Sequence, residues 1–166
     1  MATRLAISDF HTHTFLSDGV LSPVELIRRA HARGYQVIGV TDHVGGPATQ
    51  DRVIPVLIAE CALASTQWNI VAIPGVELTH LPPPLIDEAA RGAKERGARL
   101  VVVHGETIVE PVENGTNKAA LASSYVDILA HPGLLTEEEA RMAAQKGIFI
   151  ELSARRGHSL TNGHVA

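Results

Sequence analysis

Histidine and carboxylate residues recur along this chain directly after short apolar runs. The sequence contains nine histidines in 166 residues and a single cysteine. Imidazole and carboxylate groups without thiolate are typical ligands of Zn, Mn or Fe. The residues that we identify as candidate metal ligands are His11, His13, Asp18, His43, Glu77, His104 and His131. Because this set exceeds the four ligands of one structural zinc, we infer at least two divalent metal ions.

The first two candidates are separated by one residue, Thr12, at the end of a predicted strand. Residues i and i+2 of a strand point to the same side, so His11 and His13 are expected to face one site. Asp9 has the same parity and lies deeper in the strand. We expect it to accept a hydrogen bond from a ligand imidazole, as second carboxylates do around bound metals.

Three candidates also have simpler structural interpretations. Asp18 stands in a Ser-Asp-Gly segment, which is typical of a turn. Asp42 either orients a metal ligand or caps the turn that follows its strand. His131 precedes Pro132, which favours extended backbone at the histidine and would help to direct its ring.

A basic segment follows the last predicted strand, and an ordinary solvated loop is its simplest interpretation. Guanidinium groups bind phosphate oxygens through two parallel hydrogen bonds, and an imidazole can transfer a proton to a leaving group. We therefore expect Arg155 and His158 to be catalytic residues that contact a phosphorylated substrate, and leave Arg156 unassigned.

Short apolar runs predict strands at residues 5–10, 36–40, 70–73, 100–103, 127–130 and 148–152. Helical patterns lie between them, with N-terminal capping signals at Ser22 and Thr136. This alternation predicts a parallel α/β sheet covered by helices. A doubly wound sheet and a closed barrel both fit. The barrel is favoured because it gathers all strand ends, and with them the candidate ligands, around one mouth.

The composition restricts the remaining function classes. With 45% hydrophobic and 19% charged residues, residues 1–166 are expected to fold as a single domain. A net charge of −4 argues against nucleic-acid binding through bulk charge. No apolar run approaches the ~20 residues of a membrane span, so no membrane partner is expected. The lone Cys61 and the polar N-terminal region lead us to expect a cytoplasmic protein.

The ordered motifs resemble those of the PHP (polymerase and histidinol phosphatase) family. They are His11-x-His13, Ser17-Asp18-Gly19, Thr41-Asp42-His43, Gly75-Val76-Glu77, His104-Gly105 and Ala130-His131-Pro132. The resemblance implies a distorted seven-stranded, TIM-like (β/α) barrel with a trinuclear metal site that hydrolyses phosphate esters. With it, the expected cofactors become two to three divalent metal ions (Zn, Mn or Fe). Segments 103–117 and 157–164 are more similar to stand-alone members than to polymerase-attached ones.

The resemblance also implies a role for each matching residue. His11 and His13 would hold the first metal, and Glu77 would bridge it to a second. His104 and His131 would complete the second metal site, while Asp18 and His43 would belong to the third.

One part of the family pattern has no counterpart in this sequence. The pattern closes with an Asp-x-His pair after a later strand, whereas no aspartate follows residue 152. A (β/α) barrel also takes typically ~250 residues. We therefore expect an incomplete barrel of about six βα units, from a stand-alone member truncated at its C-terminus.

These observations predict a phosphoric ester hydrolase. Its substrate would be a phosphomonoester similar to histidinol phosphate, or a small phosphodiester, attacked by a metal-bridging hydroxide. Two alternatives remain open. One is an amidohydrolase-like metal hydrolase on the same barrel, and the other is a truncated PHP domain with a non-catalytic or accessory role. The sequence leaves the oligomeric state open.

Overall fold

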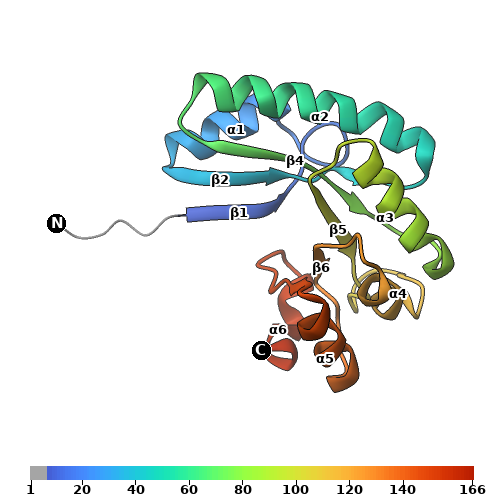
Figure 1. Ribbon diagram of the computed structural model, residues 1–166. Coiled ribbons are helices and arrows are strands. Elements are labelled where there is room, and N and C mark those ends of the chain that lie inside the picture. Colours follow the sequence, from blue (N-terminus) through green and yellow to red (C-terminus); the bar gives the residue numbers. More distant parts are fainter. Residues whose placement is uncertain (1–6) are drawn as a thin grey trace.

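The computed structural model describes residues 7–166, in which parallel strands form a curled half-barrel (Figure 1). Its main strands are β1 (Ile7–Thr12), β2 (Tyr35–Val40), β4 (Val71–Leu78), β5 (Leu100–His104), β6 (Ile128–Ala130) and β7 (Phe149–Ile150). They pair in chain order, β1-β2-β4-β5-β6-β7. A short strand, β3 (His43–Val44), pairs with β4 beyond the end of β2. Sequential parallel pairing of this kind is the arrangement of a (β/α) barrel, as predicted.

The helices lie outside the curled sheet. They are α1 (Pro23–Ala32), α2 (Pro47–Gln67), α3 (Ile86–Glu95), α4 (Thr116–Ala122), α5 (Glu137–Lys146) and α6 (Asn162–Val165), with 3-10 turns η1 (Pro83–Leu85) and η2 (His158–Thr161). Figure 1 shows α1 and α2 covering the same side of β1, β2 and β4. The buried face of α2 carries Ile54, Leu57 and Cys61, each at most 1% exposed. Among the described residues, no helix is long and apolar enough to cross a membrane.

The predicted helix caps are present. The side chain of Ser22 accepts a hydrogen bond from the Glu25 amide at the start of α1. Thr136 and Glu139 form a reciprocal capping box at the start of α5, which ends at Gly147 with a φ of 70°. These local signals place α1 and α5 correctly because capping satisfies amides that the helix itself leaves free.

Strand β4 is longer than the apolar run predicted. It continues through Pro74 and Gly75 to Leu78, whereas the prediction ended it at residue 73. The extension is possible because β4 changes neighbours: its first half pairs with β2 and its second half with β5. A Cβ atom on Gly75 would lie 2.7 Å from the carbonyl oxygen of Leu100, so glycine permits this close approach. As a result, Glu77 lies inside the strand rather than in a loop after it.

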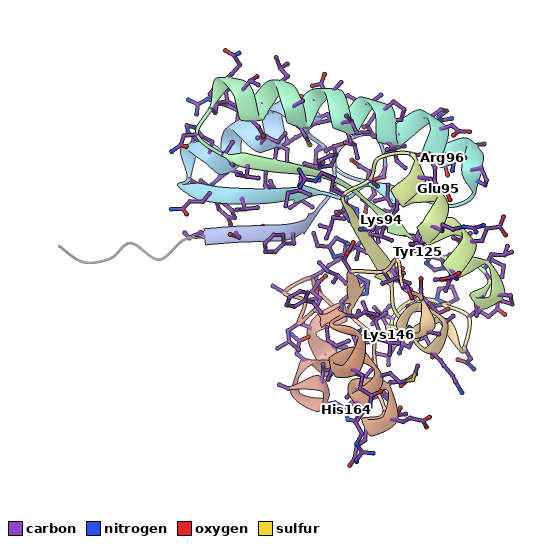
Figure 2. All side chains as sticks on the ribbon, viewed as in Figure 1. Lys94, Glu95, Arg96, Tyr125, Lys146 and His164 are labelled. Carbon is purple, nitrogen blue, oxygen red and sulfur yellow. The ribbon has the colours of Figure 1, made fainter. Side chains whose placement is uncertain are left out.

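Two lysines donate hydrogen bonds that join α3 to the sheet and α5 to α4. Lys94, in the last turn of α3 (Figure 2), donates to Asp127 Oδ2 over 2.5 Å. The same oxygen accepts from the Val101 amide, so α3, β5 and the start of β6 are joined at one carboxylate. Lys146 at the end of α5 donates to the carbonyl of Ala122 at the end of α4. These contacts fix the order of the strands whose ends carry the candidate ligands.

Candidate metal centre

The carboxylate of Glu77 lies at the centre of the candidate site and is fully buried. Its Oε2 atom is 3.2 Å from His11 Nε2, 3.2 Å from His13 Nε2 and 2.9 Å from His43 Nδ1. Its Oε1 atom is 3.7 Å from His131 Nε2. Four imidazoles that the sequence placed at the ends of three different strands therefore surround one carboxylate.

The outer nitrogens of the first two histidines are held by other carboxylates. His11 Nδ1 donates to Glu151 Oε2 over 2.5 Å, and His13 Nδ1 donates to Asp18 Oδ1 over 2.7 Å. A carboxylate on the outer nitrogen fixes the tautomer and ring orientation of a metal-binding histidine. The inner Nε2 atoms of both rings then face Glu77.

This arrangement fits a divalent cation. Within residues 7–166, neither carboxylate oxygen of Glu77 has a hydrogen-bond partner. A buried, ionised carboxylate at the meeting point of four imidazoles is costly unless a positive charge lies among them. Imidazole nitrogen and carboxylate oxygen together suit Zn, Mn or Fe. His11, His13 and Glu77, whose ligand atoms all lie within 4.8 Å of one another, are therefore the residues that would hold such an ion.

The charges of the site shift the pKa values of its members in opposite directions. Burial alone would lower the pKa of His11, but the carboxylates of Glu151 and Glu77 outweigh burial and raise it to about 10. Burial would raise the pKa of Glu77, yet the surrounding histidines hold it well below its usual range. Burial, reinforced by the neighbouring His104, lowers the pKa of His131 to about 3. Without a metal ion, His11 is thus protonated at neutral pH and His131 is neutral.

Because His11 is protonated in the absence of metal, we predict that metal binding releases a proton. A cation at His11, His13 and Glu77 must displace the Nε2 proton of His11, so its apparent affinity should rise with pH and level off above the His11 pKa of about 10. Titration calorimetry with Zn²⁺ in two buffers of different ionisation enthalpy measures this, with an expected release of about one proton at neutral pH. An apparent binding enthalpy that is independent of the buffer would contradict the prediction.

Asp18 and His43 lie beside this centre, with His13 between them. Asp18 Oδ1 is 3.6 Å from His43 Nε2, and the rings of His13 and His43 are 4.2 Å apart at their centroids. On the solvent side, Arg155 Nη2 is 3.7 Å from Asp18 Oδ2. The structure thus brings together Asp18 and His43, the pair expected for a third metal, and adds His13 to them. The ligand atoms of these three residues are also close enough to one another to hold an ion.

The two aspartates expected behind the ligands both contact backbone groups. Asp42 is fully buried and accepts from the amide and hydroxyl of Thr14, each over 2.8 Å, and from Ser17 Oγ over 2.6 Å. It therefore fixes the loop between His13 and Asp18. Asp9 accepts from the backbone amide of His11 over 3.1 Å rather than from an imidazole. Its contact stabilises the strand end instead of orienting a ring.

His131 has a conformation that the sequence did not predict. The expectation of extended backbone before Pro132 is wrong, since His131 has a φ of 31°. A non-glycine residue in this region is strained by roughly 1–3 kcal/mol and persists where its surroundings hold it. Here the Gly105 amide donates to the carbonyl of Ala130, and Asn117 Nδ2 donates to the carbonyl of Pro132. Both neighbours of His131 are thus anchored, and its ring lies 4.4 Å from that of His104.

Three side chains that the motifs did not place at the centre also reach the site. His158 is buried, and its ring centroid is 4.6 Å from that of His131. Glu110 lies 3.1 Å from His104 Nε2, and Glu151 contacts His11 as described above. Glu110 and Glu151 were missed because each is a single acidic residue without a motif around it. Only the position of Glu151, one residue after β7, could have indicated it.

The structure thus defines an α/β half-barrel of parallel strands, with imidazoles and carboxylates at the strand ends that are close enough to hold metal ions. Comparison with known proteins specifies the class further. The sequence profile of the PHP domain matches residues 9–107. The chain is 49% identical over 158 residues to the uncharacterized protein MJ1295 of Methanocaldococcus jannaschii, covering 95% of this chain and 72% of that protein. This chain belongs to the PHP domain family.

Two further proteins are similar over parts of their length. The 3',5'-nucleoside bisphosphate phosphatase of Chromobacterium violaceum is 36% identical over 77 residues, which is 45% of this chain and 23% of that enzyme. A crystal structure of a two-domain protein from Bacteroides vulgatus, described as containing a predicted PHP-like metal-dependent phosphoesterase, has a TM-score of 0.54 at 20% identity. That match covers 86% of this chain and 49% of the other, and it shows that the two share a fold.

The contact between Glu151 and His11 leads to a prediction about metal affinity. Glu151→Gln removes the charge that orients His11, so we expect metal binding to weaken by about 10–100-fold. Equilibrium dialysis with Zn²⁺, followed by elemental analysis, measures the change. The matched control is Glu95→Gln, because Glu95 lies on the exposed surface of α3 (Figure 2). Equal affinities of the two variants would show that Glu151 does not support the site.

Proposed function

We propose that this chain is a metal-dependent phosphoesterase that acts on a small phosphorylated substrate, either a phosphomonoester or a small phosphodiester. The observation that carries the proposal is the buried carboxylate of Glu77, enclosed by the imidazoles of His11, His13 and His43 at 2.9–3.2 Å. Membership of the PHP domain family supports it, as does the phosphoesterase named in the structure of similar fold.

Each residue of the site has a role in this proposal. Divalent cations bound here would polarise phosphoryl oxygens and lower the pKa of a water molecule. His11, His13 and Glu77 would hold one ion, with Glu151 fixing the ring of His11. The loop that carries Asp18 is held in place by Asp42, as its three accepted hydrogen bonds show.

Arg155 is the residue best placed to bind the phosphate group of a substrate. Its side chain is 51% exposed and lies at the rim of the site beside Asp18. It lines a groove of about 1000 Å³ that also contains His11, His13 and apolar side chains such as Phe10. A guanidinium next to metal ligands would bind phosphoryl oxygens, while the apolar wall would contact the organic part of the substrate.

The relatives' names indicate which substrates to test first. One similar enzyme is named for 3',5'-nucleoside bisphosphates, so nucleotides are included among the candidate phosphomonoesters. The net charge of −4 does not favour long nucleic acids, which are bound mainly through positive charge. We therefore propose small nucleotides and other small phosphate esters rather than polymers.

The test is turnover of phosphate esters by the full chain loaded with Zn²⁺ or Mn²⁺. The assay uses p-nitrophenyl phosphate, bis(p-nitrophenyl) phosphate and a panel of nucleoside bisphosphates. We expect metal-dependent hydrolysis that is lost in His11→Ala and kept in His31→Ala, a histidine of α1 outside the site. Hydrolysis of amides or lactams without phosphate esters would instead indicate an amidohydrolase-like enzyme. Metal binding without any hydrolysis would indicate an accessory domain.

A further inference from the structure

Four side chains, from the end of β5 and from the segments after β5, β6 and β7, meet next to the Glu77 centre. They are His104, Glu110, His131 and His158. Glu110 Oε2 lies 3.1 Å from His104 Nε2, and its Oε1 lies 3.0 Å from His158 Nε2. The rings of His104 and His158 each lie within 4.6 Å of the ring of His131. One nitrogen from each of the three rings lies within 4.8 Å of the others.

All three rings are buried, and half of their six nitrogens have no hydrogen bond within the described residues. His104 is 1% exposed, His131 3% and His158 4%. Within residues 7–166, both ring nitrogens of His158 and the Nδ1 atom of His131 lack a hydrogen bond. Buried polar atoms are hydrogen-bonded in the great majority of cases, so three such atoms in one cluster indicate a ligand that they share.

The tautomer of His104 identifies the charge of that ligand. His104 Nδ1 donates to the carbonyl of Gly105 over 3.1 Å. In the neutral ring its Nε2 atom therefore carries a lone pair, and this lone pair faces the carboxylate of Glu110. Two acceptors at 3.1 Å repel one another unless a cation binds both. A backbone carbonyl on the outer nitrogen is also the usual arrangement of a metal-binding histidine.

The backbone holds the two loops together at this point. Gly157, with a φ of 88°, packs against Val109, and a Cβ atom on Gly157 would lie 3.3 Å from Val109 Cγ1. These residues directly precede His158 and Glu110. The close packing of Gly157 and Val109 therefore places the imidazole and the carboxylate on the same side of the site.

We propose that Glu110 and His158 are metal ligands that complete, with His104 and His131, a centre of three imidazoles and one carboxylate for a divalent cation. The inference rests on the proposed metal-dependent function and extends it. The resemblance to the family gave this metal only Glu77, His104 and His131. Residues 110 and 158 lie outside the matched segment 9–107. The role of His158 changes accordingly, from a proton donor for the leaving group to a ligand.

The experiment measures metal content and affinity separately from activity. Full-length wild type, His158→Ala and Glu110→Gln are loaded with Zn²⁺, dialysed and analysed by elemental analysis and titration calorimetry. We expect each variant to lose one class of bound ion, or to bind it more than about 100-fold more weakly. A loss of this size exceeds the roughly 10–100-fold expected for a residue that contacts a metal ligand without binding the metal itself. The ion at His11, His13 and Glu77 should remain. His31→Ala is the matched control for a histidine outside the site.

A third variant covers the case in which His158→Ala does not fold. Gly157→Ala keeps both ligands but requires Val109 to move, so it should weaken the same ion and leave the other unchanged. Wild-type metal content and affinity in every folded variant would overturn the inference, even if the protein hydrolyses phosphate esters. Loss of the ion in these variants, in a protein that hydrolyses no phosphate ester, would support the inference and reject the proposed function.

Discussion

Replacing Glu77 with glutamine is expected to remove the proposed phosphoesterase activity. The amide has the size of the carboxylate but no charge, so His11, His13 and His43 lose the anion that they surround. Loss of one electrostatic stabiliser typically lowers a catalytic rate by 10²–10³-fold, and loss of a central metal ligand should cost at least roughly 10³-fold. The same variant should bind fewer ions per chain. Steady-state rates on p-nitrophenyl phosphate and elemental analysis of the dialysed protein measure both effects.

Glu106→Gln is the matched control for this substitution. Glu106 also follows a strand end, but in residues 7–166 its carboxylate accepts from the backbone amides of Gly115 and Asn117, both at Oε1. The oxygen of the glutamine amide can accept both bonds, so metal content should stay at the wild-type level. If Glu77→Gln kept its ions and its activity while Glu106→Gln lost them, Glu77 would not be the centre of the site.

The arrangement of the site was predictable to the extent that it depends on strand ends. Parallel pairing in chain order brings the carboxyl ends of all strands to one side, wherever each strand begins. For that reason His11, His43, Glu77 and His131 converge although 120 positions separate the first from the last. The prediction required only the alternation of strands and helices, which hydrophobic periodicity shows directly.

The features that were missed depend on tertiary contacts. The extension of β4 through Pro74 arises because its second half pairs with β5, a partner that no local pattern indicates. The left-handed backbone of His131 is held by hydrogen bonds to the carbonyls of Ala130 and Pro132 from Gly105, directly after β5, and from Asn117 of α4. Glu110 reaches the site only because its loop packs against Gly157. Each feature is determined by a neighbour far along the chain rather than by the adjacent residues.

Removing the metal ions is expected to destabilise the fold as well as stop catalysis. Without cations, Glu77 and the buried rings of His131 and His158 keep polar atoms that have no partner in residues 7–166. A ligand present at 1,000 times its Kd stabilises the native state by about 4.1 kcal/mol. For a domain of this size, 1 kcal/mol shifts Tm by roughly 2–4 °C. Dialysis against EDTA should therefore lower Tm by about 8–16 °C, as measured by circular dichroism.

The Glu77→Gln variant separates metal binding from other effects of the chelator. Because this variant should already lack the central ion, EDTA should shift its Tm much less than that of the wild type. Adding back Zn²⁺ or Mn²⁺ should restore both Tm and activity in the wild type, and the more effective ion would identify the preferred metal. Identical melting of the wild type with and without EDTA would mean that the imidazole cluster is stable on its own. The proton that His11 holds in the absence of metal would then be sufficient to compensate the charge of Glu77.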